Sequence, residues 1–179
     1  MLTRGLVQVY TGDGKGKTTA ALGLALRAAG QGNRVLFCQF LKPSSLDLGE
    51  RKAIAQMEGI TLRIVDAPWD MRSSLADPAA VAGARKAVAD AIAELEPGVA
   101  VRAWDVVILD EIVYCLSQGL ADLDDLKRLI AARHENVEII LTGRSAPAEL
   151  IELADLVTEM KSVKHPFDSP LPARRGIEY

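Results

Sequence analysis

The chain has 179 residues, of which 49% are hydrophobic and 4% aromatic, and its net charge at pH 7 is -3. This length suits a single domain with one aliphatic core. The slightly negative charge argues against a broad surface for nucleic acid, and no apolar run is long enough to cross a membrane. Cys38 and Cys115 make no disulfide framework or metal pattern, so we expect both to be buried in a cytoplasmic protein.

Strand and helix patterns alternate along the chain. In chain order, the apolar segments predicted as strands are Leu6–Tyr10, Arg34–Gln39, Thr61–Val65, Val106–Leu109, Val137–Leu141 and Leu156–Met160. The predicted helices are Lys17–Ala29, a short Gly49–Glu58, one capped by Asp77 and stopped by Pro97-Gly98, one capped by Asp122, and one starting at Ser145-Ala146-Pro147. Residues 66–76 are expected to form a loop, and the proline-containing tail, about 161–179, an irregular segment.

This alternation predicts an α/β fold, in which helices flank a mostly parallel central sheet on both faces. We expect one domain over residues 1–179, because no linker, repeat or low-complexity segment divides the chain. In such sheets ligands bind beyond the carboxyl ends of the strands. The motifs described next all follow predicted strands, so we expect them to meet at that edge.

The most informative motif is the glycine-rich turn Gly12–Thr19, which lies between the first strand and the first helix. Its glycines let the backbone turn tightly and bring main-chain N–H groups close to an anion. Lys17 adds positive charge for phosphates, and the Thr18 hydroxyl can ligate Mg²⁺. Thr11 stands where the usual G-x-x-x-x-G-K-[ST] pattern has its first glycine. The turn predicts the nucleotide site of a P-loop NTPase, formed by Gly12, Asp13, Gly14, Lys15, Gly16, Lys17, Thr18 and Thr19.

Two acidic residues, Asp110 and Glu111, follow the buried-type strand Val106–Leu109. Carboxylates in this place can reach a magnesium ion directly or through water. Taken alone, the pair could equally be two solvated acids at a strand end. Beside a glycine-rich loop, the pair favours a metal site.

Three further residues have both a structural and a functional interpretation. Arg144 follows a predicted strand and could bind phosphate with its guanidinium, or could be an ordinary surface residue. Arg27 lies in the first helix, where a solvated position is the simpler interpretation. Trp69 lies in a loop and either packs on the domain or offers a flat face to a planar ligand.

Four stretches, in order along the chain, resemble the P-loop corrinoid adenosyltransferases, which are ATP:cob(I)alamin adenosyltransferases. They are Gly12–Thr19, Gln39–Lys42 followed by Gly49-Glu50, Leu109–Glu111 with Tyr114, and the region from Leu141 that reads LTGR, ELADLVTEMKSVKHPFD and finally GIEY. General P-loop ATPases share only the first and third of these. The resemblance covers nearly the whole chain.

The resemblance implies a RecA-like homodimer that transfers the 5′-deoxyadenosyl group of ATP to the Co(I) of a reduced corrinoid and releases triphosphate. Cobalt would be the nucleophile, in keeping with the lack of any catalytic-triad pattern in the sequence. By motif match, Lys17 and the loop amides would bind phosphates, and Thr18 and Glu111 would ligate Mg²⁺ with Asp110 nearby. Arg27 and Arg144 fall on family positions near the nucleotide. The corrinoid would be cob(I)alamin or a precursor, reduced by a flavoprotein partner.

The chain departs from the family pattern on the corrinoid side. It starts almost at the first strand, whereas some members carry a preceding helix that helps to cover the corrinoid. Ala67 stands where some members have a phenylalanine two residues before the tryptophan that matches Trp69. These aromatic residues are linked to removal of the lower axial ligand of the corrinoid. We therefore expect the lid of the corrinoid site to be missing or built otherwise.

Two other functions fit parts of the same pattern. A P-loop ATPase or kinase would use Glu111 to activate water or an acceptor hydroxyl, and would release ADP. A nucleotide-binding or corrinoid-carrying module would bind ATP without turnover. The joint run of motifs through the tail favours the adenosyltransferase.

Overall fold

The computed structural model describes residues 2–70, 73–164 and 173–177. Residues 165–172 and 178–179, which include part of the stretch that carries the resemblance, lie outside the described residues. The strands are β1 (Val7–Thr11), β2 (Val35–Gln39), β3 (Ile60–Ile64), β4 (Val106–Asp110), β5 (Glu138–Thr142) and β6 (Leu156–Glu159). The helices are α1 (Lys17–Gly30), α2 (Gly49–Ile54), α3 (Pro78–Ala100), α4 (Ile112–Ser117), α5 (Leu123–Ala132) and α6 (Ala148–Leu153), with a 3₁₀ turn η1 (Ser74–Ala76).

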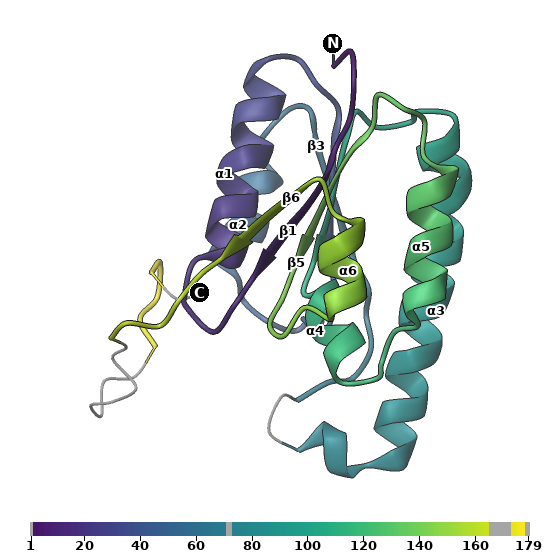
Figure 1. Cartoon of the computed structure of the whole chain (residues 1–179). Helices are drawn as coiled ribbons and strands as arrows, with labels where there is room; N and C mark the ends of the chain where they lie inside the picture. Colours follow the sequence, from purple (N-terminus) through teal and green to yellow (C-terminus); the bar gives the residue numbers. More distant parts are fainter. Residues whose placement is uncertain (1, 71–72, 165–172, 178–179) are drawn as a thin grey trace.

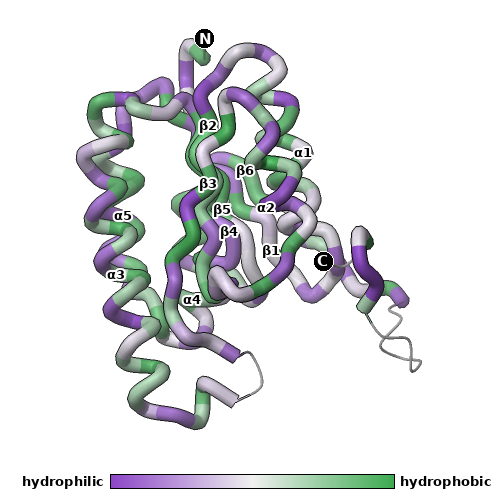
Figure 2. The backbone as a smooth tube through the Cα atoms, turned by 180° about the vertical axis from the view of Figure 1, so that it is seen from behind, coloured by the Kyte–Doolittle hydropathy of each residue, from purple (hydrophilic) through white to green (hydrophobic). Residues whose placement is uncertain are grey.

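The strands form one six-stranded sheet in the order β3-β2-β4-β5-β1-β6, and each neighbouring pair is parallel. Helices α1 and α2 cover one face, and α3, α4, α5 and α6 cover the other (Figure 1). From behind, the strands lie between these two layers (Figure 2). The predicted α/β class, with three layers around a parallel sheet, is confirmed. Among the described residues, no helix is long and apolar enough to span a membrane.

The register of the sheet brings the predicted motifs to one edge. Asp110 at the end of β4 is opposite Gln39 at the end of β2, and Thr142 at the end of β5 is opposite Tyr10. Because the strands are parallel and end at similar levels, the loops that follow β1, β2, β4 and β5 emerge side by side.

The caps predicted for two helices are present. The Asp77 carboxylate accepts a hydrogen bond from the Ala79 amide at 2.9 Å, and Asp122 accepts one from Asp124 at 2.9 Å. Each carboxylate satisfies an amide that has no partner within its helix, which explains where α3 and α5 begin.

The prediction that Pro97-Gly98 stops a helix is wrong, because α3 continues to Ala100. Pro97 costs the last turn one backbone hydrogen bond, but Val99 in that turn is fully buried in the core. Gly98 serves another purpose. A Cβ atom added there would lie 2.4 Å from a ring carbon of Trp104, so glycine lets the indole pack on the helix.

Two other local predictions differ from the structure. Helix α4 was not predicted, because the first five of its six residues form the continuous apolar run Ile112–Leu116 and give no readable period. Helix α2 ends at Ile54 rather than Glu58, since the amide of Met57 turns back to the carbonyl of Ile54 instead of continuing the helix. The predicted loop 66–76 contains the short turn η1.

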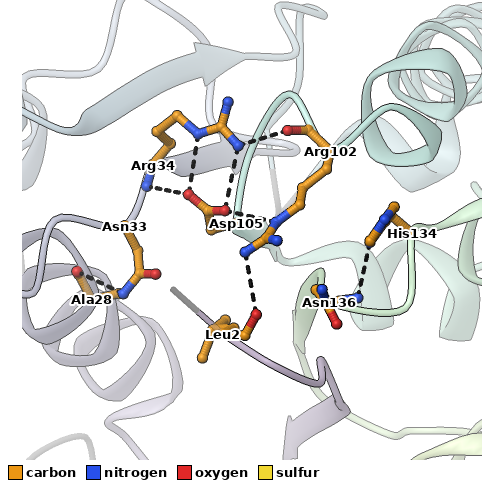
Figure 3. A network of polar contacts seen from close by, with 8 residues as sticks. All are labelled: Leu2, Ala28, Asn33, Arg34, Arg102, Asp105, His134 and Asn136. Atoms are coloured by element: carbon orange, nitrogen blue, oxygen red, sulfur yellow. Dashed lines mark hydrogen bonds and ion pairs between the residues drawn. The ribbon is translucent and has the colours of Figure 1, made fainter.

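At the opposite, amino-terminal edge of the sheet, a buried carboxylate holds several segments together (Figure 3). Asp105 accepts hydrogen bonds from the Arg34 backbone N–H at 2.9 Å and from the Arg102 guanidinium at 2.9 Å, and it is paired with the Arg34 guanidinium. Arg102 also donates to the carbonyl of Leu2. The hydrogen bonds and charge of Arg34 lower the pKa of Asp105 to about 2.

Candidate nucleotide site

The glycine-rich loop is closely packed against the segment that follows β6. The Gly14 amide donates a hydrogen bond to the Met160 carbonyl at 2.7 Å, and the Met160 amide donates to Thr11 at 2.8 Å. Gly12 has φ +91°, and a Cβ atom added there would lie 2.4 Å from the Met160 carbonyl oxygen. Glycine is therefore required at position 12 for both conformation and space.

Lys17 is held inside the curve of this loop. Its side chain is buried, and its ammonium donates to the carbonyls of Gly12 at 2.7 Å and Gly14 at 2.8 Å. Burial, reinforced by the charge of Arg144, lowers the pKa of Lys17. An incoming anion would relieve this effect, since it would add negative charge beside the ammonium.

Asp110 connects three elements beneath the loop. This fully buried carboxylate accepts hydrogen bonds on Oδ1 from Thr18 Oγ1 at 2.8 Å and Thr142 Oγ1 at 2.7 Å, and on Oδ2 from Lys42 Nζ at 2.7 Å. Burial alone would lower the pKa of Lys42, but the charge and hydrogen bond of Asp110, together with the charges of Glu111 and Glu50, outweigh it and raise that pKa. In this arrangement Asp110 orients the Thr18 hydroxyl.

Glu111 follows in a left-handed conformation, with φ +69°, at the start of α4. This conformation is costly for glutamate and is characteristic of functional sites. The Glu111 amide donates to Thr142 Oγ1 at 3.0 Å, which fixes the backbone, and its side chain lines the cavity. Burial raises the pKa of Glu111, and the adjacent Asp110 charge raises it further.

The residues of the carboxyl edge enclose a cavity of about 500 Å³. Its charged lining residues are Lys15, Lys17, Lys42, Arg144, Asp13, Glu50 and Glu111. Leu22 from α1, Leu48 and the tail residues Ala173, Gly176 and Ile177 supply the less polar part. The cavity therefore offers cations and loop amides at one place and apolar contacts beside them, which suits a ligand with a polyphosphate and an organic part.

A magnesium ion is compatible with this donor set. The Thr18 hydroxyl and the Glu111 carboxylate both line the cavity, and Mg²⁺ bound with a nucleotide needs only one or two protein ligands besides phosphate oxygens and water. Among the described residues, no cluster of three or more histidine, cysteine or acidic side chains forms a complete protein metal site.

Most of the predicted site residues meet at this cavity. Seven of the eight loop residues line it, as do Glu111 and Arg144, whereas Gly12 and Asp110 lie beneath. Arg27 and Trp69 do not line it: Arg27 is exposed in the last turn of α1, and Trp69 is buried in the core on the side of α3. Their expected contacts with the nucleotide and the corrinoid stay predictions.

Sequence reasoning gave no role to Lys42 or Thr142. Lys42 follows β2 and Thr142 ends β5, and both strands border β4, so their position at the carboxyl edge was the available signal. Leu41, which precedes Lys42, has φ +55°, a left-handed conformation that no local sequence pattern predicts. The contribution of residues 173–177 to the cavity had no local sequence signal at all.

The first strand of the parallel sheet leads through a glycine-rich loop into a helix. Lys17 lies inside the loop, and the hydroxyl of the next residue, Thr18, is hydrogen-bonded to the buried Asp110. These features define a P-loop nucleotide-binding protein. Residues 3–179 match the sequence model of the family described as ATP:corrinoid adenosyltransferase BtuR/CobO/CobP. The chain belongs to this family of adenosyltransferases.

Individual relatives match nearly the whole of this chain and most of their own length. The chain is 34% identical over 182 residues to the corrinoid adenosyltransferase of Escherichia coli (strain K12). The matched region covers 98% of this chain and 86% of the relative. It is 34% identical to the corrinoid adenosyltransferase CobA of Salmonella typhimurium, with the same coverage. It is 33% identical over 179 residues to the corrinoid adenosyltransferase of Pseudomonas aeruginosa, covering 98% of this chain and 84% of the relative.

Proposed function

We propose that the cavity binds ATP with Mg²⁺ and that the protein transfers the 5′-deoxyadenosyl group to the Co(I) of a reduced corrinoid. The observation that carries this proposal is the grouping of Lys17, Lys42 and Arg144 with the loop amides around one cavity. In the reaction, an electron pair of Co(I) forms the bond to C5′, the bond from C5′ to the triphosphate oxygen breaks, and triphosphate leaves with the electron pair of that broken bond. Cobalt becomes formally Co(III).

The tasks of the protein are placement and charge stabilisation. Lys17 and the loop amides hold the phosphates, and Arg144 approaches them from the β5 side. Lys42 adds a further charge from the β2 side. Preorganised cations stabilise the triphosphate as its negative charge grows, and they need no rearrangement at that moment.

Thr18 and Glu111 would hold Mg²⁺, with Asp110 orienting Thr18 from below. When bound, the ion supplies charge neutralisation for the leaving triphosphate. Lys42 is 3.5 Å from Thr18 Oγ1, so its ammonium lies at the edge of this metal position. Family membership does not favour the ATPase or kinase alternative, in which Glu111 would activate water or a hydroxyl.

Several finer properties are part of the same proposal. Arg27 would contact the nucleotide and Trp69 the corrinoid. The protein would act as a cytoplasmic homodimer with a single domain per chain, and a flavoprotein reductase would supply the electron that generates Co(I). Cob(I)alamin and its biosynthetic precursors are the candidate substrates.

A turnover assay tests the function. The protein is incubated with ATP, Mg²⁺ and chemically reduced cobalamin or a precursor, and the optical spectrum of the corrinoid and the phosphate product are measured together. Adenosylated corrinoid and intact triphosphate are expected in equal amounts. ADP and phosphate from folded protein, without adenosylated corrinoid, would instead support the ATPase.

A further inference from the structure

The loop of residues 42–48, called here the 42–48 loop, forms one wall of the nucleotide cavity. Lys42 and Leu48 at its two ends line the cavity, and Lys42 reaches Asp110 from it. Within the loop, the Leu46 amide donates to the Pro43 carbonyl at 3.1 Å. The position of Lys42 therefore depends on what holds the loop from outside.

One side chain supplies most of that support. Arg51, in α2, donates from Nη2 to the Lys42 carbonyl at 2.6 Å and from Nη1 to the carbonyls of Pro43 at 2.9 Å and Leu46 at 3.3 Å. Its Nε donates to Gln39 Oε1 at 2.8 Å. One planar guanidinium thus joins the end of β2 to three carbonyls of the loop, which a point charge could not do in the same geometry.

A second set of hydrogen bonds holds the loop at Ser44. Asp66, which follows β3, accepts hydrogen bonds from the Ser44 amide at 3.0 Å and from the Ser44 hydroxyl at 2.6 Å. Arg51 itself does not line the cavity. Arg51 therefore acts on a bound nucleotide through its neighbours: through the backbone of the loop, which carries Lys42, and through Gln39, which donates to the cavity residue Glu50 at 3.2 Å.

The contacts run in an unbroken series to the metal position. Arg51 holds the backbone of Lys42, Lys42 Nζ binds Asp110 Oδ2, and Asp110 Oδ1 accepts from the Thr18 hydroxyl. If the loop moves, Asp110 loses a cation and Thr18 loses a fixed orientation.

We propose that Arg51 is a positioning residue for the nucleotide site: its guanidinium sets the 42–48 loop so that Lys42 and Thr18 meet Mg²⁺ and the triphosphate correctly. This inference rests on the proposed function insofar as the ligand is ATP with Mg²⁺. Residues that orient direct metal ligands commonly change metal affinity or activity ~10–100-fold when removed.

The test compares R51A and R51K with wild type by calorimetric titration with ATP in excess Mg²⁺, and then by the Mg²⁺ concentration required for half-maximal adenosylation. R51A is expected to bind MgATP ~10–100-fold more weakly and to require more Mg²⁺. The KM for the corrinoid is expected to stay within about twofold of wild type, because Arg51 lies behind the phosphate side of the cavity. R51K keeps the positive charge but lacks the forked guanidinium, so it should bind MgATP much more weakly than wild type does.

Lys52→Ala is the matched control. Lys52 is the next residue of α2 and pairs with Asp47 of the same loop, but this pair is exposed and touches no loop carbonyl. The control should bind MgATP as wild type does. The proposal is overturned if R51A, folded by circular dichroism, keeps the wild-type affinity and Mg²⁺ requirement. If R51A does not fold, a folded R51K with wild-type values overturns it.

The two proposals fail in different ways. Wild type that binds MgATP but never adenosylates a corrinoid contradicts the proposed function, while the calorimetric comparison still decides the role of Arg51. Wild type that adenosylates normally, with R51A equal to it, contradicts only the role of Arg51.

Discussion

Asp110 and Thr18, which are far apart in the sequence, are joined by a hydrogen bond of 2.8 Å from the Thr18 hydroxyl to Asp110 Oδ1. The bond ties the end of β4 to the first turn of α1, so the glycine-rich loop between β1 and α1 is fixed from beneath. Because the Asp110 carboxylate also binds Thr142 and Lys42, its lone pairs are directed at three donors at once.

Replacing Asp110 with Asn should therefore destabilise the protein as well as the site. The amide presents a donor where only acceptors are wanted, and it leaves the Lys42 ammonium without its counter-charge. We expect a loss of ~3 kcal/mol in the free energy of unfolding, measured by urea denaturation. Asp90→Asn, which breaks the exposed pair with Lys86, should cost less than about 1 kcal/mol. Equal losses for the two variants would contradict the account of Asp110.

Glu111→Gln tests the proposed metal ligand. The amide oxygen is a weaker ligand than a carboxylate, so the Mg²⁺ concentration for half-maximal adenosylation should rise on the order of 10-fold or more. Removal of a half-buried negative charge beside Asp110 should at the same time leave the fold at least as stable. Glu152→Gln, on the exposed part of α6, should shift neither quantity. An unchanged Mg²⁺ requirement for the Glu111 variant would remove it from the metal site.

Two glycine substitutions should act in opposite directions. Gly12→Ala forces a left-handed conformation on alanine and a clash with the Met160 carbonyl, so we expect a loss of ~2 kcal/mol and greatly weakened ATP binding. Gly23→Ala lies in α1 with nothing within 4 Å of the added Cβ, and should stabilise the protein by about 0.5–1 kcal/mol. Thermal and urea denaturation measure both. A tolerated Gly12→Ala would mean that the loop can leave the β6 segment freely.

The free energy of unfolding should depend on pH in the acid range because of Asp105. Its pKa is lowered in the folded protein to about 2, below the ordinary value of 3.8, so its contribution is complete above the ordinary value and is lost as the pH falls through 2. The shift corresponds to about 2 kcal/mol. The free-energy difference between wild type and Asp105→Asn should be constant near neutral pH and shrink in this acid window. A difference that does not change with pH would exclude ionic stabilisation by Arg34 and Arg102.

Neither cysteine should react with a thiol reagent in the native state. Burial raises the pKa of the Cys38 thiol to about 12 and also raises that of Cys115, so almost no thiolate forms near neutral pH. Labelling with an aromatic disulfide reagent should follow the unfolding transition in urea. Rapid labelling of one thiol in native protein would reveal local opening around it.

The sequence indicated the elements whose signal is local. The order of strands and helices, the two aspartate caps and the loop Gly12–Thr19 depend on residues that are neighbours in the chain. The meeting of Asp110 with Thr18 was suggested only in general terms, by the rule that carboxyl ends of parallel strands share an edge.

The features that were not predicted arise from contacts between distant segments. Pro97-Gly98 has the pattern of a helix end, but burial of Val99 and the ring of Trp104 decide otherwise. The hold of Arg51 on the 42–48 loop uses backbone carbonyls, which have no signature in side-chain identity. Lys42 could have been assigned to the site from its place after β2.

The tail has a practical consequence for handling the protein. Ala173, Gly176 and Ile177 line the nucleotide cavity, and Arg175 is 3.7 Å from Asp47 across its rim. The other end of the chain is anchored far from there, where Arg102 binds the Leu2 carbonyl at the amino-terminal edge of the sheet. A bulky group attached at Ile177 would therefore lie at the entrance that substrates must use, whereas one attached at Leu2 would leave that entrance free.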